Sequence, residues 1–106
     1  MLTIPSEAIP ERKVPVIVRS GAYTVYFERT SGLTFIHCDV LCPWTKDIKQ
    51  RLSADWKALR ALHEGPIYAL HTPSDTKHEK FLLMMGFHYA ASFIGHDGSP
   101  HDIYKI

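Results

Sequence analysis

The chain carries a histidine and an acid, residue types that can exchange protons, at neighbouring positions of one predicted strand. His37 and Asp39 lie two positions apart in a segment, residues 33–41, that has the pattern of a β-strand. Side chains at positions i and i+2 of a strand point to the same face of the sheet, so these two should be neighbours. Histidine changes its charge near neutral pH and often serves as a general base. We interpret the two as a satisfied or solvent-facing pair without a chemical role, with proton transfer as the alternative.

Seven histidines and two cysteines invite a metal hypothesis. Their spacing gives it little support, because the sequence holds neither a His-x-x-x-His pair on one helix nor a Cys-x-x-Cys pair. A structural zinc held by Cys38, Cys42 and His37 is the alternative. We therefore expect no metal, and we expect reduced thiols, since two cysteines do not make a disulfide framework.

Length and charge narrow the classes of protein. The 106 residues suffice for one domain, and 12 basic residues against 11 acids give a net charge of +1. This balance argues against a nucleic-acid partner and against a polybasic membrane surface. No stretch approaches the roughly 18 apolar residues that span a bilayer, and the N-terminus lacks the apolar core of a signal peptide. The sequence predicts a cytoplasmic protein that is not secreted.

Hydrophobic periodicity predicts the elements that position these residues. Strands are expected at residues 14–19, 22–29, 33–41, 66–71, 87–94 and 101–106. A helix of about four turns should begin after its N-cap Thr45 and end before Gly65-Pro66, and a second should span residues 76–85. Lysines and arginines on the first helix are interpreted as a solvated face, with a binding patch as the alternative.

The resulting order, β-β-β-α-β-α-β-β, predicts an α/β fold, an α+β sandwich with a mixed, mostly antiparallel sheet. The third strand, the long helix and the fourth strand should form a parallel, right-handed crossover. Residues 14–106 are expected to make a single domain. A proline-bearing arm at residues 1–13 precedes it, because Pro5 and Pro10 disfavour regular structure there.

The second helix and the segment after it are locally well specified. Thr76 and Glu79 have the spacing of a capping box, in which each side chain satisfies a backbone donor at the helix start. Gly86 follows the last apolar helical residue and is expected to form a left-handed C-cap. Phe87 then opens a strand.

This unit, with its Gly86-Phe87 pair, resembles the last helix and following strand of the GNAT family, the acetyl-CoA-dependent N-acetyltransferases. The order of elements over residues 66–106 is similar to that of the family. The resemblance implies a general base on the central strands, which places His37 or Asp39 in that role. It also implies that Thr45 and Asp75, at the starts of the two helices, are the candidates for cofactor binding.

The family's frequent catalytic tyrosine lies four residues before the Gly-Phe pair, where this chain has Leu82. Tyr68 and Tyr89 could serve as surrogate acids, and both fit equally well as aromatic strand residues. The family's glycine-containing pyrophosphate loop corresponds to residues 41–50, which hold no glycine. Glycine matters there because the backbone must approach the phosphates without interference from Cβ.

These departures lead to an expectation about function. The family normally opens with a strand and two helices, whereas here we expect only the arm at residues 1–13 before the first strand of the meander. We expect a shortened, non-catalytic GNAT-like interaction or structural protein that binds no cofactor and docks on a protein partner or larger assembly through this arm. The chain is also similar to small acetyltransferase-like proteins encoded by phages, which implies the host cytoplasm or a virion. The alternative is an acetyl-CoA-dependent N-acetyltransferase with an atypical cofactor loop.

Overall fold

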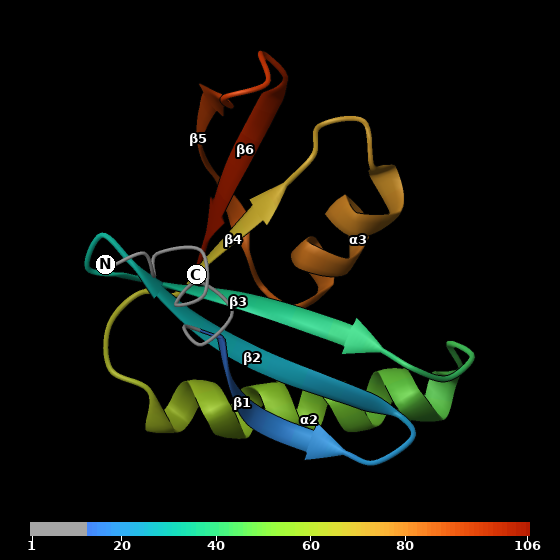
Figure 1. The fold of residues 1–106 in the computed structure, drawn as a ribbon. Coiled ribbons are helices and arrows are strands. Elements are labelled where there is room, and N and C mark those ends of the chain that lie inside the picture. Colours follow the sequence, from blue (N-terminus) through green and yellow to red (C-terminus); the bar gives the residue numbers. More distant parts are fainter. Residues whose placement is uncertain (1–12) are drawn as a thin grey trace, which may run out of the picture. The chain divides into compact units, whose positions relative to one another are not determined.

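The computed structural model describes residues 13–106, which hold six β-strands and two α-helices (Figure 1). The elements follow one another in the predicted order, β-β-β-α-β-α-β-β, and the predicted α/β class is confirmed. Contacts within the chain divide these residues into two compact units, with the boundary between His63 and Glu64. Each unit contains three strands and one helix.

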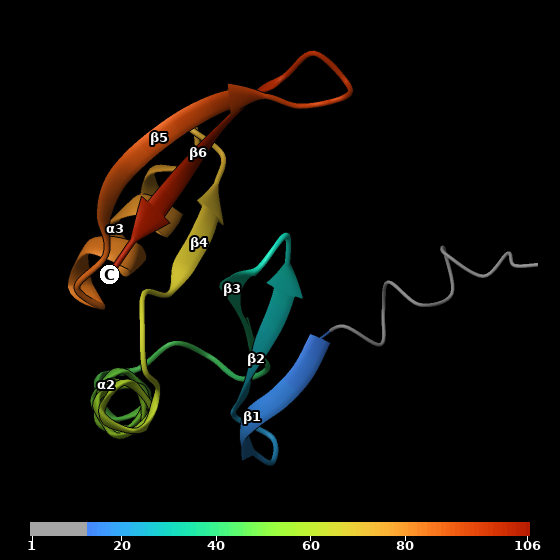
Figure 2. The ribbon, with the colours of Figure 1, turned by 90° about the vertical axis from the view of Figure 1, so that its left-hand side faces the viewer.

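The first unit is an antiparallel meander with one helix. The strands are β1 (Lys13–Arg19), β2 (Tyr23–Thr30) and β3 (Leu33–Val40), and each pairs with the next along the chain. The helix α2 (Lys46–Leu62) begins after its N-cap Thr45, as predicted. Figures 1 and 2 show α2 running beside the meander.

The turn between β2 and β3 fixes the register of this hairpin. Thr30 pairs with Leu33, so only Ser31 and Gly32 form the turn. Both have positive φ angles, 53° and 78°, which is the requirement of a type I′ turn and matches the twist of the flanking strands. A shift by one residue would exchange the two faces of β3, so the position of every β3 side chain depends on this turn.

The core of the first unit lies between α2 and one face of the meander. Tyr23 and Val25 on β2 are buried, as are Leu52 and Trp56 on α2. Asp55 of α2 accepts a hydrogen bond from the Tyr23 hydroxyl at 2.6 Å. Because side chains alternate along a strand, the residues between these buried ones point away from α2.

The second unit is a three-stranded antiparallel sheet with one helix. Its elements are β4 (Tyr68–His71), α3 (Thr76–Met84), β5 (His88–Ile94) and β6 (Pro100–Lys105). β6 lies in the middle and pairs with both β4 and β5 (Figure 2). The helix packs on the face that carries Tyr104, whose hydroxyl donates to Glu79 of α3 at 2.9 Å.

The start of α3 differs from the predicted capping box. The N-cap is Asp75 and not Thr76, and the Asp75 carboxylate accepts from the backbone N–H of His78 at 3.0 Å. Asp75 and Thr76 are both good N-cap residues, and the carboxylate also favours the positive end of the helix dipole. The predicted partner Glu79 instead accepts from Tyr104.

The end of α3 is as predicted. Gly86 has φ +96°, its N–H donates to the carbonyl of Leu83, and the N–H of Phe87 donates to the carbonyl of Leu82. These two bonds are those of a Schellman motif. Leu82 and Phe87 are both buried, so the cap also turns the chain into the core of this unit.

Several expectations stay predictions. The crossover from the third to the fourth strand joins the two units, and its handedness is not tested. The arm falls on residues 1–12, which lie outside the described part of the chain, while Lys13 already belongs to β1. Over residues 13–106, no helix is long and apolar enough to cross a membrane.

Candidate functional site

His37 on β3 lies against an acid that the sequence analysis did not select. Its Nε2 lies 2.6 Å from Oε1 of Glu28 on β2, and both side chains are largely shielded from water. Tyr26 is the direct cross-strand neighbour of His37, so Glu28 reaches it along the diagonal. If Nε2–H donates to this carboxylate, Nδ1 carries the lone pair and can accept a proton.

Asp39 shares a face with His37, as predicted, but is exposed and lies opposite Thr24. The acid that contacts the imidazole is therefore Glu28. Phe35 completes this face of β3, which points away from α2 because it alternates with the face that packs on the helix. This face combines one imidazole, two carboxylates and two aromatic rings.

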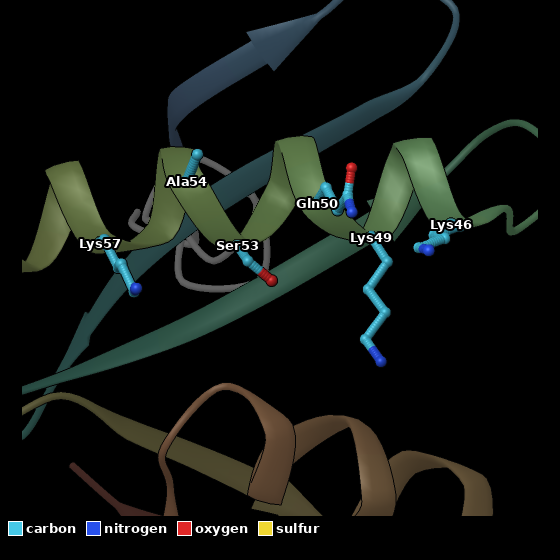
Figure 3. A pocket seen from close by; sticks show the side chains of 6 residues that line it. All are labelled: Lys46, Lys49, Gln50, Ser53, Ala54 and Lys57. Carbon is cyan, nitrogen blue, oxygen red and sulfur yellow. The ribbon is translucent and has the colours of Figure 1, made fainter.

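A second feature is a hollow of about 360 Å³ along α2. It is lined by Lys46, Lys49, Gln50, Ser53, Ala54 and Lys57, all from this helix. Lys49, Ser53 and Lys57 extend from the same side of α2 (Figure 3). The lining thus contains three ammonium groups, a hydroxyl and an amide, and no acid. Such a surface suits a ligand with several negative charges.

The start of α2 adds to this positive character. The Thr45 hydroxyl accepts from the backbone N–H of Ile48 at 3.2 Å, so Thr45 acts as a cap. The amides of Lys46 and Asp47 have no acceptor within the helix, and the helix dipole favours an anion at this end. The Asp47 carboxylate in the first turn opposes an anion there. Pro43 lacks an N–H, so the preceding loop offers fewer donors than a glycine-rich loop does.

The remaining candidates lie in the second unit. Asp75 is occupied as the N-cap of α3. Tyr68 is half-buried on β4 and alternates with Ala69 and His71, so it points away from α3. Neither Asp75 nor Tyr68 belongs to the unit that contains His37. The roles predicted for them, cofactor binding and proton donation, are not tested.

Metal ligation has no geometric basis in the described residues. Over residues 13–106, no three His, Cys, Asp or Glu side chains are grouped so that they could hold an ion. Cys38 and Cys42 are both free thiols. Burial, with a contribution from Asp39, raises the pKa of Cys38 to about 11, so this thiol is protonated at neutral pH.

Comparison with solved structures identifies the fold. The chain is similar to a GNAT-family acetyltransferase from Bacillus anthracis, with a TM-score of 0.65, 16% identity, and coverage of 90% of this chain and 65% of that one. It is also similar to the ribosomal-protein-S5-alanine acetyltransferase from Vibrio fischeri, with a TM-score of 0.59, 18% identity, and coverage of 80% and 53%. The chain spans roughly half to two thirds of the length of these structures. No protein-family model matches the sequence, and no curated protein sequence matches it significantly.

The chain therefore has the GNAT fold, which confirms the resemblance noted in the sequence. The expectation of a non-catalytic, virion-associated docking protein is wrong, because both of the solved structures named above are acetyltransferases. They favour the alternative that the sequence left open. The similarity to phage-encoded proteins, and a protein partner that binds through the arm, are not tested and stay predictions.

Proposed function

We propose that this chain is an acetyl-CoA-dependent N-acetyltransferase in which His37 is the general base. The observation that carries the proposal is the contact of 2.6 Å between His37 and Glu28 on a fold shared with acetyltransferases. A fold alone does not determine function, so the proposal depends on this pair.

The roles of the two side chains follow from their geometry. An amine attacks a carbonyl carbon only through its lone pair, so a proton must leave the nitrogen during the reaction. Nδ1 of His37 accepts this proton. Glu28 accepts the hydrogen bond from Nε2, holds the ring in one orientation and stabilises the imidazolium that forms. When bound, acetyl-CoA supplies the acetyl thioester.

The face around His37 favours an acceptor with additional positive charge. Glu28 and Asp39 place two carboxylates on this face, and Tyr26 and Phe35 add flat apolar surface. A cationic amine would be attracted by the acids, and its methylene groups could pack on the rings. Diamines and lysine-containing peptides are thus the first acceptors to test.

The hollow on α2 fits the anionic part of coenzyme A. The phosphate groups carry several negative charges, and Lys46, Lys49 and Lys57 offer three positive ones without an acid in the lining. The hollow begins at Lys46, the first residue of α2, and His37 lies three residues before the end of β3. Both features therefore flank, in the sequence, the segment that connects β3 to α2, while the His37 side chain lies on the face of β3 that points away from α2.

The substitution His37→Gln tests the base. The glutamine amide can take the place of Nε2 and donate to Glu28, but it lacks the basic nitrogen at Nδ1. Removing a general base typically lowers kcat about 10²- to 10⁴-fold, and we expect such a loss in release of free CoA from acetyl-CoA with a diamine acceptor. Unchanged kcat in a folded H37Q protein would contradict the role of His37.

Lys49→Gln tests the cofactor surface, with Arg51→Gln as the matched control because Arg51 lies on α2 outside the hollow. Each exposed ion pair contributes up to about 1 kcal/mol, so K49Q should weaken CoA binding about two- to fivefold and R51Q should not. Titration calorimetry at low and high salt measures the effect. Equal affinity of K49Q and the unmodified protein would exclude the hollow as the phosphate site.

A further inference from the structure

Two histidines of the second unit meet through the same ring atom. His71, the last residue of β4, is 3% exposed, and His78 lies in the first turn of α3. Their Nδ1 atoms are 3.0 Å apart, which is a hydrogen-bond distance, and their ring centroids are 5.1 Å apart. This contact joins the strand to the helix.

The contact requires a particular number of protons. A neutral imidazole has one N–H and one lone pair, so the pair shares one proton between the two Nδ1 atoms. The pair can take up one further proton without losing this hydrogen bond, since a charged imidazolium ring still donates from its Nδ1 to a neutral ring. When both rings are charged, two N–H groups face each other and the hydrogen bond is lost.

The surroundings offset that second charge only in part, although Asp75 lies nearby and Asp102 is the cross-strand partner of His71. Three carboxylates belong to the elements around the pair, and each already accepts a hydrogen bond. Asp75 of α3 accepts from the His78 backbone, Glu79 of α3 from Tyr104, and Asp102 of β6 from Ser92 of β5. The positive end of the α3 dipole also disfavours a cation at His78.

Aromatic groups complete the environment. The ring of Tyr104 on β6 meets His71 edge-on, with centroids 5.2 Å apart, and Tyr89 on β5 packs on Tyr104. These rings exclude water from His71 and leave it without a solvent shell for a charge. Tyr104 is neutral in mild acid, as tyrosines are, and burial and the nearby Glu79 raise its pKa further.

We propose that the His71–His78 pair is an acid-sensitive latch that holds the first turn of α3 on β4 and releases it when both rings are protonated. The proposal is independent of the acetyltransferase proposal, because it concerns the stability of the second unit and not turnover. It predicts that α3 loosens selectively in mildly acidic solution.

The direction of the pH effect follows from the native state. Burial and the positive charge that His71 can carry lower the pKa of His78, and Asp75 offsets this only in part. The unfolded chain titrates near pH 6.5 and so binds the proton first as the pH falls. Stability is therefore present above about pH 6.5 and is lost between that value and the lower native pKa.

The substitution His78→Asn tests the latch. The asparagine amide occupies the place of Nδ1 and can bond His71 without titrating. Hydrogen exchange of the α3 amides, expressed as protection factors between pH 8 and 5, is the readout. In the unmodified protein, protection should fall up to about tenfold per pH unit below pH 6.5, since one linked proton has that effect.

In H78N the protection of α3 should vary little over the same range. His96→Asn, in the exposed turn between β5 and β6, is the matched control and should behave like the unmodified protein. If H78N does not fold, ¹⁵N spectra of the imidazole rings at pH 7 decide, because the latch requires one shared proton at Nδ1. The same pH dependence in H78N and the unmodified protein, or two rings that each carry the proton on Nε2, would overturn the proposal.

Discussion

The carboxylate of Asp55 joins α2 to the first two strands, and its removal should destabilise the first unit. Its oxygens accept from the Tyr23 hydroxyl at 2.6 Å and from Nε and Nη2 of Arg19 at 2.8 and 2.7 Å. Tyr23 is 0% exposed, so Asp55→Ala leaves its hydroxyl buried without this acceptor. Leaving a buried donor unsatisfied costs about 1–3 kcal/mol. The Arg19 side chain is half exposed, so solvent screens its share.

Urea unfolding followed by circular dichroism measures the loss in the free energy of unfolding. Asp55→Asn keeps an oxygen for Tyr23 and should lose less than Asp55→Ala. Tyr23→Phe removes the donor itself, so D55A should cost much less in the Y23F background than alone. Equal costs of D55A in both backgrounds would refute the claim that the buried hydroxyl determines the loss.

The contact between Asp55 and Tyr23 also predicts that the free energy of unfolding falls at both low and high pH. The hydrogen bonds from Arg19 and Tyr23 lower the pKa of Asp55 below its usual value, so its contribution to stability falls as the pH drops through the native pKa. Burial and the hydrogen bond to Asp55 raise the pKa of Tyr23 to about 12. A raised native pKa stabilises the protein below the unfolded value near 10, and this contribution is lost as the pH rises toward 12. In D55A, the free energy of unfolding should depend less on pH in both ranges.

Two further predictions concern single side chains. Gly86→Ala should lower the free energy of unfolding by about 1–2 kcal/mol, because alanine at a φ of +96° is strained, and a thermal melt without a shift would argue against the Schellman cap. Cys38 should be alkylated by iodoacetamide at pH 8 at least about tenfold more slowly than a free cysteine, because its pKa of about 11 leaves little thiolate. Mass spectrometry of the labelled peptides measures this rate, and rapid labelling of Cys38 in the folded protein would contradict its burial.

Local patterns in the sequence predicted the elements and most of their ends, and the failure at α3 shows where such patterns stop. Thr45 and Gly86 act through residues within one turn, so spacing alone identified both caps. At the start of α3, Asp75 and Thr76 offer equivalent local solutions. Glu79, the capping-box partner of Thr76, is instead bound by Tyr104, a residue 25 positions away that no local motif contains.

The partial prediction of the site has a related cause. His37 and Asp39 follow from strand alternation, but Glu28 becomes the neighbour of His37 only through the register of the β2–β3 hairpin. The two-residue turn at Ser31-Gly32 sets that register. A three-residue turn over the same segment would have shifted the pairing and separated Glu28 from the imidazole.

The lysines of α2 show a different limit of what the sequence can predict. A helix that packs on a sheet must place polar residues opposite its buried stripe, so Lys49 and Lys57 are expected whether or not they bind a ligand. What distinguishes a binding surface from a solvated one is the absence of compensating acids across the lining and a hollow that several like charges line. Both are properties of side-chain positions in space. The charge pattern along α2 therefore gains functional meaning only beside the start of the helix, where the dipole and Lys46 favour the same sign of ligand.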